Sequence, residues 1–543
     1  MVYALPVQAF FDNKMGFFEG AAARVRDGRD LLAFADEYAQ LSKYPFVARS
    51  HILLQQEFEQ LFASLKAKKK NRRDLWLYCY YCALMLETYH THYGQKAKAQ
   101  EYRAIADKIK ASYKGERPPK REKSEDAFFT RVGKAISQDL VEMAKTPTQV
   151  SKLRDKVGFY NIVRIYWVFC RLTFTNSLRL LRDVKILELL ENAIGKNIDV
   201  DAVVETLEAP NSIFRAFSVG FFLARLILNG LVAAKHMAGS SKEERTLPFK
   251  ERFVLEMYKR HPVFLNDVVW AVVNGVTNYA QVFHISAAAA GWITAGFMVF
   301  DFALILWRRH LAEQEYLAKK AQYTAELAHC EHHRDMERYA LVVEQLKNLE
   351  INWQAKNSTF LFNATAALML GAGFSASMLF TSPVLIVLSY AVCMVAVAMY
   401  LSDGAYNNYK EKSLRLQQMQ VEQQLEQAHE KNIVGEDLAR VLKEYQAARN
   451  EFIFTMIKNT VMPTLILATF AVCWQAALVL IAVYAAYELW NAYCKKKGTP
   501  QEPDVFEMVP ARNENSVVLI ERDENPEVDD PYCDNDLKGF YAI

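Results

Sequence analysis

The second half of the chain alternates between long apolar blocks and highly charged blocks. The apolar blocks run from Val263 to Trp307, from Thr359 to Leu401 and from Phe452 to Trp490. Each is roughly 40–45 residues long, about twice the ~20 residues that a membrane-crossing helix needs. Two antiparallel helices joined by a tight turn explain this length better than one long helix does. The pattern therefore predicts three transmembrane hairpins, over residues 262–307, 358–402 and 452–494.

Each block has a polar interruption near its middle that can form the turn of a hairpin. The three interruptions are His284-Ile285-Ser286, Thr381-Ser382-Pro383 and Trp474-Gln475. Pro383 suits the first position of a new helix, where no backbone N–H is needed. The third block also fits a single tilted span, because Lys458 and Pro463 shorten its first arm. Buried core helices of a large soluble protein are the alternative for all three blocks.

Charge predicts the orientation of the hairpins. No Lys or Arg lies within the first block, whereas basic residues such as Arg308, Lys410 and Lys495 follow the three blocks. By the positive-inside rule the hairpin turns face out, and the N-terminus, the coils and the C-terminus face the cytoplasm. Cys330 should then react with thiol reagents from the cytoplasmic side. Basic residues and aromatic clusters open the blocks at intervals of about 95 residues, so an internal repeat is a further prediction.

Two charged segments of helical composition, residues 308–357 and 403–451, separate the blocks. Because both ends of each segment must return to the bilayer, each is expected to fold back as an antiparallel helical coil. Apolar stripes at helical spacing support this prediction. The stripe of the first coil comprises Met336, Tyr339, Val343, Leu346, Leu349 and Trp353. The stripes of the second coil are Leu414, Val421, Leu425 and Ala428, facing Leu438, Leu442, Tyr445 and Ala448. The Gln-rich run from Gln417 to Gln427 is either a solvated face or a surface for a partner helix.

The region before the hairpins is predicted to be helical throughout. Residues 1–126 should form a soluble domain in which Asp74–His92 and Lys96–Tyr113 pair at Gly94. Within residues 127–261, Tyr160–Leu181 and Ile213–Met237 are apolar but carry several cations. An Arg at the centre of a bilayer costs about 2.5–3.5 kcal/mol, so helices lying in the membrane interface are favoured. Soluble core helices and spanning helices are the alternatives for both segments.

The bulk composition narrows the class of protein. A net charge of only +3 over 543 residues argues against a dedicated nucleic-acid binder. The eight cysteines are scattered, which excludes a disulfide framework. Cys79 and Cys82 form a CxxC, and His329 and His333 lie one helical turn apart, but neither set has further ligands at fixed spacing. Since no catalytic motif is present either, the chain is expected to be no enzyme and to hold no cofactor or metal.

Several polar residues fall inside the apolar blocks, where an ionisable side chain is costly and implies a function or a partner. The candidates for an intramembrane polar site are Asp301, Asp267, Asn274 and Lys458. Asp301 either lines an ion or proton pathway or makes an interhelical hydrogen bond or ion pair, with Lys458 as its candidate partner. Small residues that allow close helix packing are Gly371, Gly373, Ser375 and Ser377.

Residues 495–543 form an acidic tail with too little apolar patterning to fold alone, so disorder is predicted. Acidic clusters at Glu521–Glu524 and Glu527–Asp530 precede an apolar end, Phe540-Tyr541-Ala542-Ile543. This tail resembles the C-terminal translocation signals of Dot/Icm-type (type IVB) secreted effectors. Hairpins combined with coils are similar to the coiled-coil membrane effectors of intracellular bacteria. The resemblance implies delivery into a host cell and insertion in a host organelle membrane.

The sequence favours a non-enzymatic, multi-pass membrane protein that binds proteins through its coils or tethers membranes. Its expected partners are the lipid bilayer and proteins that bind its helical coils, no nucleic acid is expected, and self-association into a homo-oligomer is left open. The competing hypothesis is a channel or transporter that uses Asp301. The two hypotheses differ in whether the purified, reconstituted chain conducts ions.

Overall fold

The computed structural model describes residues 6–27, 30–68, 73–114, 168, 170–195, 199–208, 211–333, 335–427, 435–472, 479–480 and 483. Within these ranges every regular element is a helix and no strand occurs, which confirms the all-α prediction. The predicted turn at Trp474-Gln475, residues 115–167 and the acidic tail at 495–543 lie outside the described residues.

Five helices make up the N-terminal part of the structure. They are α1 (Val7–Arg26), α2 (Leu31–Leu41), α3 (Tyr44–Lys68), α4 (Arg73–His92) and α5 (Lys96–Tyr113). Their shared core is rich in aromatic rings, and Phe17 stacks on Tyr81 with 4.9 Å between ring centroids. Cys79 and Cys82 lie in this core as buried, free thiols, where they pack between helices. Burial raises the pKa of both thiols, which keeps them protonated.

The predicted helix pair joined at Gly94 is confirmed. α4 and α5 pack against each other, and Gly94 between them has a φ of +74°. This left-handed conformation suits glycine, which has no Cβ to clash with the backbone. Helical periodicity and one glycine between the two segments are therefore sufficient to predict both helices and their turn.

The middle of the chain forms α8 (Ile186–Ile194), α9 (Val200–Glu208), α10 (Asn211–Ala238), the short 3-10 helix η2 (Glu244–Thr246) and α11 (Phe249–Asn278). α10 and α11 pack side by side. The predicted boundary at Pro262 is not a helix end, because Pro262 lies inside α11. The charged residues 249–260 are the first turns of that helix.

Two long helices run without a break from an apolar half into a charged half. They are α12 (Ala287–His332) and α13 (Met336–Leu379), which pack along each other. Ser286 caps α12 by accepting a hydrogen bond from the backbone N–H of Ala289 at 3.2 Å. Asp335 caps α13 in the same way through the N–H of Arg338 at 3.1 Å. The first coil thus folds back as an antiparallel helix pair, as predicted, with its bend between His332 and Met336.

The second predicted hairpin consists of the end of α13 and α14 (Pro383–Leu401). Its turn lies at Thr381–Pro383 as predicted, and Pro383 occupies the first turn of α14. By length and composition, three helices of the described part could cross a membrane: α12, α13 and α14. The first arm of the predicted first hairpin belongs to α11 and the first arm of the third to α16 (Gly435–Val472), and neither helix is among these three.

The second coil is an antiparallel pair of α15 (Asp403–Gln427) and α16, as predicted. Lys412 on α15 and Glu444 on α16 form an ion pair at 2.6 Å. The predicted stripe is only partly correct, because Val421 is 55% exposed while Leu416, outside the stripe, is buried. The cause is that α15 also packs against α13, which turns a second face of the helix inward.

The stripe predicted for the first coil needs a similar correction. Leu349 is buried as expected, but Met336 is 67% exposed, and Leu341, Val342 and Gln345 are buried instead. α13 packs against α3 as well as against α12, so more than one face of it is covered. A stripe that assumes one partner helix cannot reproduce this pattern.

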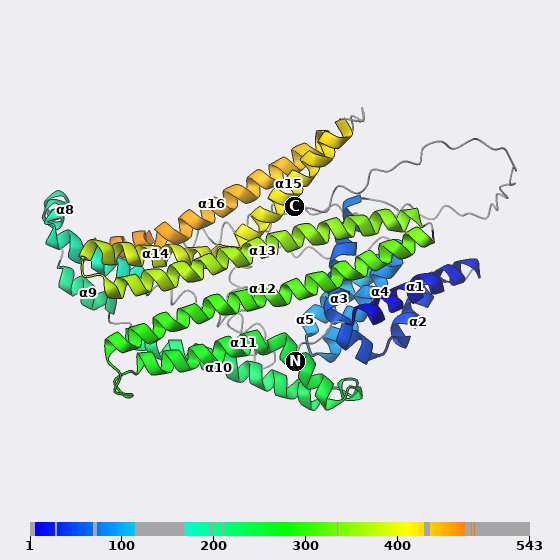
Figure 1. The fold of residues 1–543 in the computed structure, drawn as a ribbon, viewed down its shortest axis with the longest axis horizontal. Coiled ribbons are helices and arrows are strands. Elements are labelled where there is room, and N and C mark those ends of the chain that lie inside the picture. Colours follow the sequence, from blue (N-terminus) through cyan, green and yellow to red (C-terminus); the bar gives the residue numbers. More distant parts are fainter. Residues whose placement is uncertain are drawn as a thin grey trace.

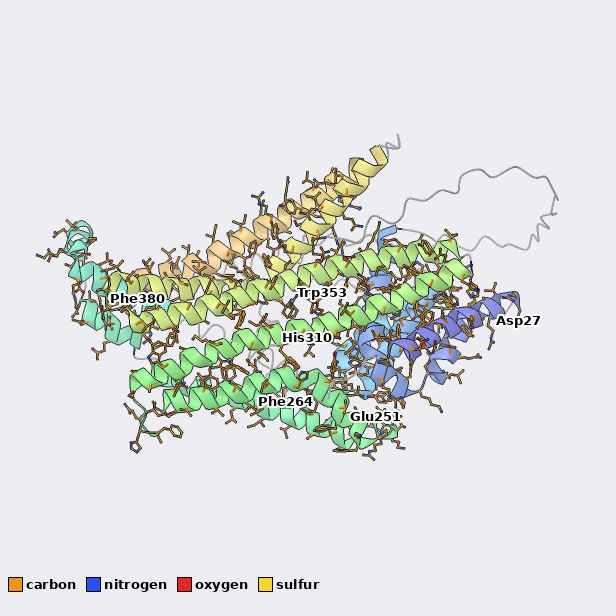
Figure 2. All side chains as sticks on the ribbon, in the orientation of Figure 1. Asp27, Glu251, Phe264, His310, Trp353 and Phe380 are labelled. Carbon is orange, nitrogen blue, oxygen red and sulfur yellow. The ribbon has the colours of Figure 1, made fainter. Side chains whose placement is uncertain are left out.

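The molecule is elongated along α12 and α13, as Figure 1 shows. The turns that follow α11 and α13 lie at one end, together with α8 and α9, and helices α1 to α5 lie toward the other. In Figure 2, Phe380 marks the end with the turns, while His310 and Trp353 lie near the middle of the two long helices. The second coil diverges from α13 on the side away from α11.

Candidate functional site

The polar residues of the first apolar block are held by partners on neighbouring helices. Asp267 on α11 is fully buried and forms an ion pair with Arg225 on α10. The side-chain amide of Asn229 donates to the other carboxylate oxygen at 3.4 Å. A buried carboxylate needs such an opposite charge, since its desolvation is otherwise uncompensated. The pair therefore fastens α10 to α11.

Asp301 on α12 accepts a hydrogen bond from the indole N–H of Trp270 on α11 at 2.6 Å. Asn274, one turn further along α11, donates to the backbone carbonyl of Trp270 at 2.7 Å. The structure therefore gives Asp301 an aromatic partner on the adjacent helix, in place of the predicted partner Lys458 on α16. Asp267 and Asp301 thus belong to the contacts of α11 with its two neighbours, whereas Asn274 bonds within its own helix.

The small residues of α13 face two helices. A Cβ added at Gly373 would lie 2.8 Å from the backbone oxygen of Ser389 on α14, and one at Gly371 would lie 3.5 Å from the Cβ of Met298 on α12. Ser377 is buried and donates to its own helix, to the carbonyl of Phe374 at 2.7 Å, while Ser375 is half-buried. Gly373 in particular permits a close approach of α13 to α14.

A second polar cluster connects α11 to the N-terminal helices. Glu256 on α11 accepts hydrogen bonds from Tyr93 at 3.0 Å and from Arg260 at 3.0 Å. Lys259 donates to Tyr89 at 2.8 Å and to Glu256 at 3.3 Å. Burial would raise the pKa of Glu256, but Lys259 and Arg260 outweigh it and lower this pKa. The carboxylate therefore stays charged between its cations.

The largest set of buried charges lies where the N-terminal helices meet the first coil. Glu57 on α3 is fully buried and binds two ammonium groups, Lys14 on α1 at 2.7 Å and Lys319 on α12 at 2.6 Å. Lys319 also donates to the side chain of Gln322 at 3.0 Å and to the carbonyl of Leu53 at 3.3 Å. Three helices are thus joined through one carboxylate.

The chain of charges continues from Lys14 to the end of the coil. Lys14 binds Glu326 on α12 at 2.6 Å, and Glu326 accepts from Arg338 on α13 at 2.9 Å. The guanidinium of Arg338 lies 4.0 Å from the ring centroid of Phe18 on α1, a cation–π contact. We call Arg338, Glu326, Lys14, Glu57 and Lys319 the docking network, in which positive and negative groups alternate.

Burial and mutual attraction compete in the docking network. Burial would raise the pKa of Glu57, but Lys14 and Lys319 outweigh it and hold this pKa well below the ordinary carboxyl value. At Lys14 burial lowers the pKa, yet Glu326 and Glu57 produce a net rise. At Lys319 burial prevails and the pKa is lowered. The ionised form of Glu57 is therefore the one that the folded structure stabilises.

The docking network was not foreseen from the sequence. Lys319 lies in the charged segment that follows the first apolar block, and no sequence pattern indicates that it is fully buried. Cys330, expected to be reactive, is only 1% exposed, and burial raises its pKa. Charged residues within amphipathic helices usually face water, so no local signal separates these from solvated ones. Their partners lie far away along the chain.

The described residues contain no group of three or more His, Cys, Asp or Glu side chains that could hold a metal ion. His329 and His333 stack on each other at the tip of the first coil, with 4.3 Å between ring centroids. No known protein family, curated protein or solved structure matches the chain. Its function must therefore be inferred from the geometry described above.

Proposed function

We propose that this chain is a non-enzymatic, membrane-anchored scaffold that holds a helical domain beside the bilayer and offers its second coil to protein partners. The observation that carries the proposal is the continuity of α12 and α13. Each helix is long and apolar enough to cross a membrane and extends into the coil that binds α1 and α3. A helix that is rigid over this length fixes the N-terminal helices relative to the membrane.

Exposed apolar side chains support a lipid environment for one half of the molecule. Leu223, Ile227 and Leu231 follow one face of α10 and are 46%, 51% and 63% exposed. Val384 and Leu388 on α14 are also exposed. In water such a surface would favour aggregation, whereas in a bilayer it contacts hydrocarbon. The hairpin turns lie at the end away from α1 to α5 (Figure 1), in keeping with a topology that leaves the N-terminal helices and both coils on one side.

The hydrogen bonds of the intramembrane carboxylates favour an anchor over a channel. Asp267 is paired with Arg225, and Asp301 accepts from Trp270, so both groups have partners that hold helices together. A site that passes ions needs groups that exchange protein partners for the ion. We therefore expect purified chain in liposomes to show no ion flux, measured with a fluorescent pH or potential dye, and Asp301→Asn to change nothing.

The same preparation tests the anchor itself. The protein should stay in the pellet after alkaline carbonate washing, and protease added outside should cleave both coils or neither. Release into the supernatant would contradict the proposal, and ion flux abolished by Asp301→Asn would replace it with a channel.

The partner surface can be tested with a photo-crosslinking amino acid at Val421 or Leu442, which are 55% and 40% exposed on the second coil. Crosslinks to specific proteins are expected from these positions and not from buried Ala448 on the same coil.

The resemblance to secreted effectors adds that the partner and the membrane belong to a host cell. A reporter fused to residues 495–543 should then be translocated by a type IVB system, and a reporter that stays in the donor cell would remove this part of the proposal.

A further inference from the structure

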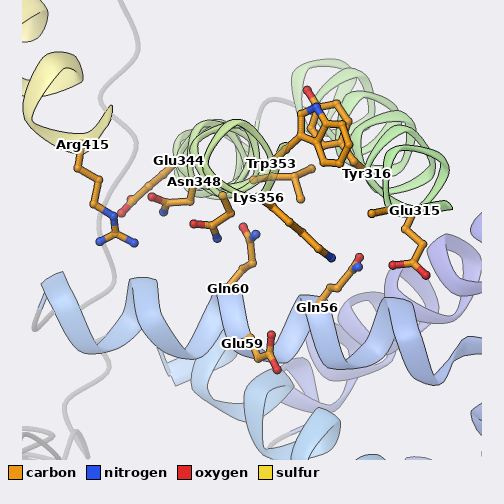
Figure 3. A pocket seen from close by; sticks show the side chains of 13 residues that line it. Gln56, Glu59, Gln60, Glu315, Tyr316, Glu344, Asn348, Trp353, Lys356 and Arg415 are labelled. Atoms are coloured by element: carbon orange, nitrogen blue, oxygen red, sulfur yellow. The ribbon is translucent and has the colours of Figure 1, made fainter. Parts of the chain in front are cut away.

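A cleft of about 380 Å³ lies where α3, the first coil and the start of the second coil meet (Figure 3). Gln56, Glu59 and Gln60 line it from α3, Glu315 from α12, Lys356 from α13 and Arg415 from α15. The residues of α12 and α13 that line it lie in the charged halves of these helices. None of the lining residues belongs to the docking network, although Glu57 of that network lies between Gln56 and Gln60 on α3.

Two amide groups in the cleft have unmet hydrogen-bonding capacity. The side-chain oxygens of Gln56 and Gln60 are buried, and neither has a hydrogen-bond partner in the described part of the chain. Gln60 as a residue is only 9% exposed. Figure 3 shows both side chains pointing from α3 toward the two long helices. Buried polar atoms are normally hydrogen-bonded, so these two acceptors indicate a donor supplied from outside the chain.

The charges around the cleft favour a cation. Three carboxylates, Glu59, Glu315 and Glu344, line it together with two cations, Lys356 and Arg415. Arg415 is paired with Glu411 at 2.9 Å, while Glu315 accepts from Tyr258 at 3.2 Å and Glu59 accepts from Gln55 at 2.8 Å. The lining as a whole therefore has one more carboxylate than cation. Carboxylates and amide oxygens at close range attract an ammonium group and hold it by hydrogen bonds.

One wall of the cleft is aromatic. Tyr316 on α12 and Trp353 on α13 stack with 5.1 Å between ring centroids and an angle of 11° between rings. The ammonium of Lys320 already lies over the Tyr316 ring, 5.8 Å from its centroid, so this wall offers a ligand apolar contact for its methylene groups rather than a free ring face for its charge. The wall and the acceptors together describe a ligand that has both an apolar stem and N–H donors.

We propose that this cleft binds an organic cation bearing primary amines. Each ammonium group offers three N–H donors, which match the two amide oxygens and the carboxylates. The source is either a soluble polyamine or the headgroup of an aminolipid, because the cleft lies close to the apolar half of the molecule. This inference goes beyond the scaffold function, and only its aminolipid source rests on the membrane anchoring proposed there.

The first test is calorimetric titration of the purified full-length chain in detergent micelles with spermidine at low ionic strength. Gln60→Leu removes an acceptor without changing the charge, so spermidine binding should weaken at least tenfold. Gln354→Leu is the matched control, because Gln354 is exposed on α13, donates to Glu350 and does not line the cleft. Absence of binding to the unaltered chain, or equal affinities for it and for Gln60→Leu, would overturn the proposal.

Two charge variants keep the test decisive if Gln60→Leu fails to fold. Glu59→Gln removes an attractive charge and should weaken spermidine binding severalfold, while Lys356→Gln removes a repulsive one and should strengthen it. Opposite or absent effects of both variants contradict an amine ligand.

To separate the two sources, the titration is repeated in phosphatidylcholine nanodiscs with and without phosphatidylethanolamine. Weaker spermidine binding in the presence of the aminolipid assigns the site to the headgroup, and unchanged binding assigns it to a soluble amine.

Discussion

Single charged residues hold the helices of this protein together where water is excluded. Glu57, Asp267 and Glu256 are each buried at 3% exposure or less, and each has at least one cation within 3.5 Å. A buried carboxylate with its cations in place stabilises one arrangement of helices, and removal of one member leaves the others uncompensated. The sequence indicated that Asp267 and Asp301 need partners, but Arg225 and Trp270 are specified only by the packing of α10, α11 and α12.

The substitution Glu57→Gln should detach the N-terminal helices from the first coil. Lys319 loses its carboxylate and Lys14 keeps only Glu326, so the folded arrangement should be destabilised by about 3–5 kcal/mol. Chemical unfolding in micelles, followed by thiol labelling of Cys330 mapped by mass spectrometry, measures the change. The matched control is Glu251→Gln, which breaks the half-exposed ion pair with Arg49 and should cost less than about 1 kcal/mol. Equal effects of the two variants would contradict a special role for Glu57.

The positions of helices were predicted more correctly than which of their sides are buried. The predicted positions of α4, α5 and the start of α14 are correct, because helical periodicity, Gly94 and Pro383 indicate them. These signals are local, because capping and turn formation depend on a few consecutive residues. The start of the first hairpin predicted at residue 262 is wrong, because Pro262 lies inside α11. Which sides of α13 and α15 are buried depended on third helices, so the expected stripes were only partly correct.

The contact of α13 with α14 offers a test at this scale. Gly373→Ala would put a Cβ 2.8 Å from the backbone oxygen of Ser389 and 2.9 Å from the sulfur of Cys393, so the helices must move apart. We expect a destabilisation of about 1–3 kcal/mol, seen as a lower melting temperature in micelles. Gly296→Ala on α12 meets nothing within 4 Å and should be neutral or slightly stabilising. An unchanged melting temperature for Gly373→Ala would show that the two helices are not tightly packed.

The whole molecule joins an apolar half to a polar half through two continuous helices, and the docking network lies on the polar side. The docked state depends on an ionised Glu57, whose pKa is held below the ordinary value of 4.5. A group with a lowered folded-state pKa stabilises the fold fully above its unfolded pKa, and this stabilisation is lost progressively as the pH falls from that value through the folded-state pKa. Acid should therefore undock the N-terminal helices.

This pH dependence can be measured through Cys330, which is 1% exposed in the docked state. A disulfide reagent that reacts with thiols in acid, such as 4,4′-dithiodipyridine, should label Cys330 slowly at neutral pH and much faster below about pH 4. In Glu57→Gln the labelling should be fast at both pH values. Slow labelling at every pH in the unaltered chain would show that protonation of Glu57 does not control docking.

The sequence by itself determined that the protein is helical, where helices such as α4, α5 and α14 lie, and that the blocks containing α12, α13 and α14 are apolar enough for a membrane. These properties arise from composition and from contacts between residues close along the chain, which short-range periodicity records. The tertiary structure alone decided that Lys319 is a buried ligand of Glu57, that Asp301 meets Trp270, and that an amide-lined cleft opens between α3 and the coils. These contacts join residues of different helices. Lys319 and Glu57 are 262 positions apart in the sequence, and Trp270 and Asp301 are 31 positions apart. No pattern along a single helix distinguishes a charge that faces water from one that faces a distant partner.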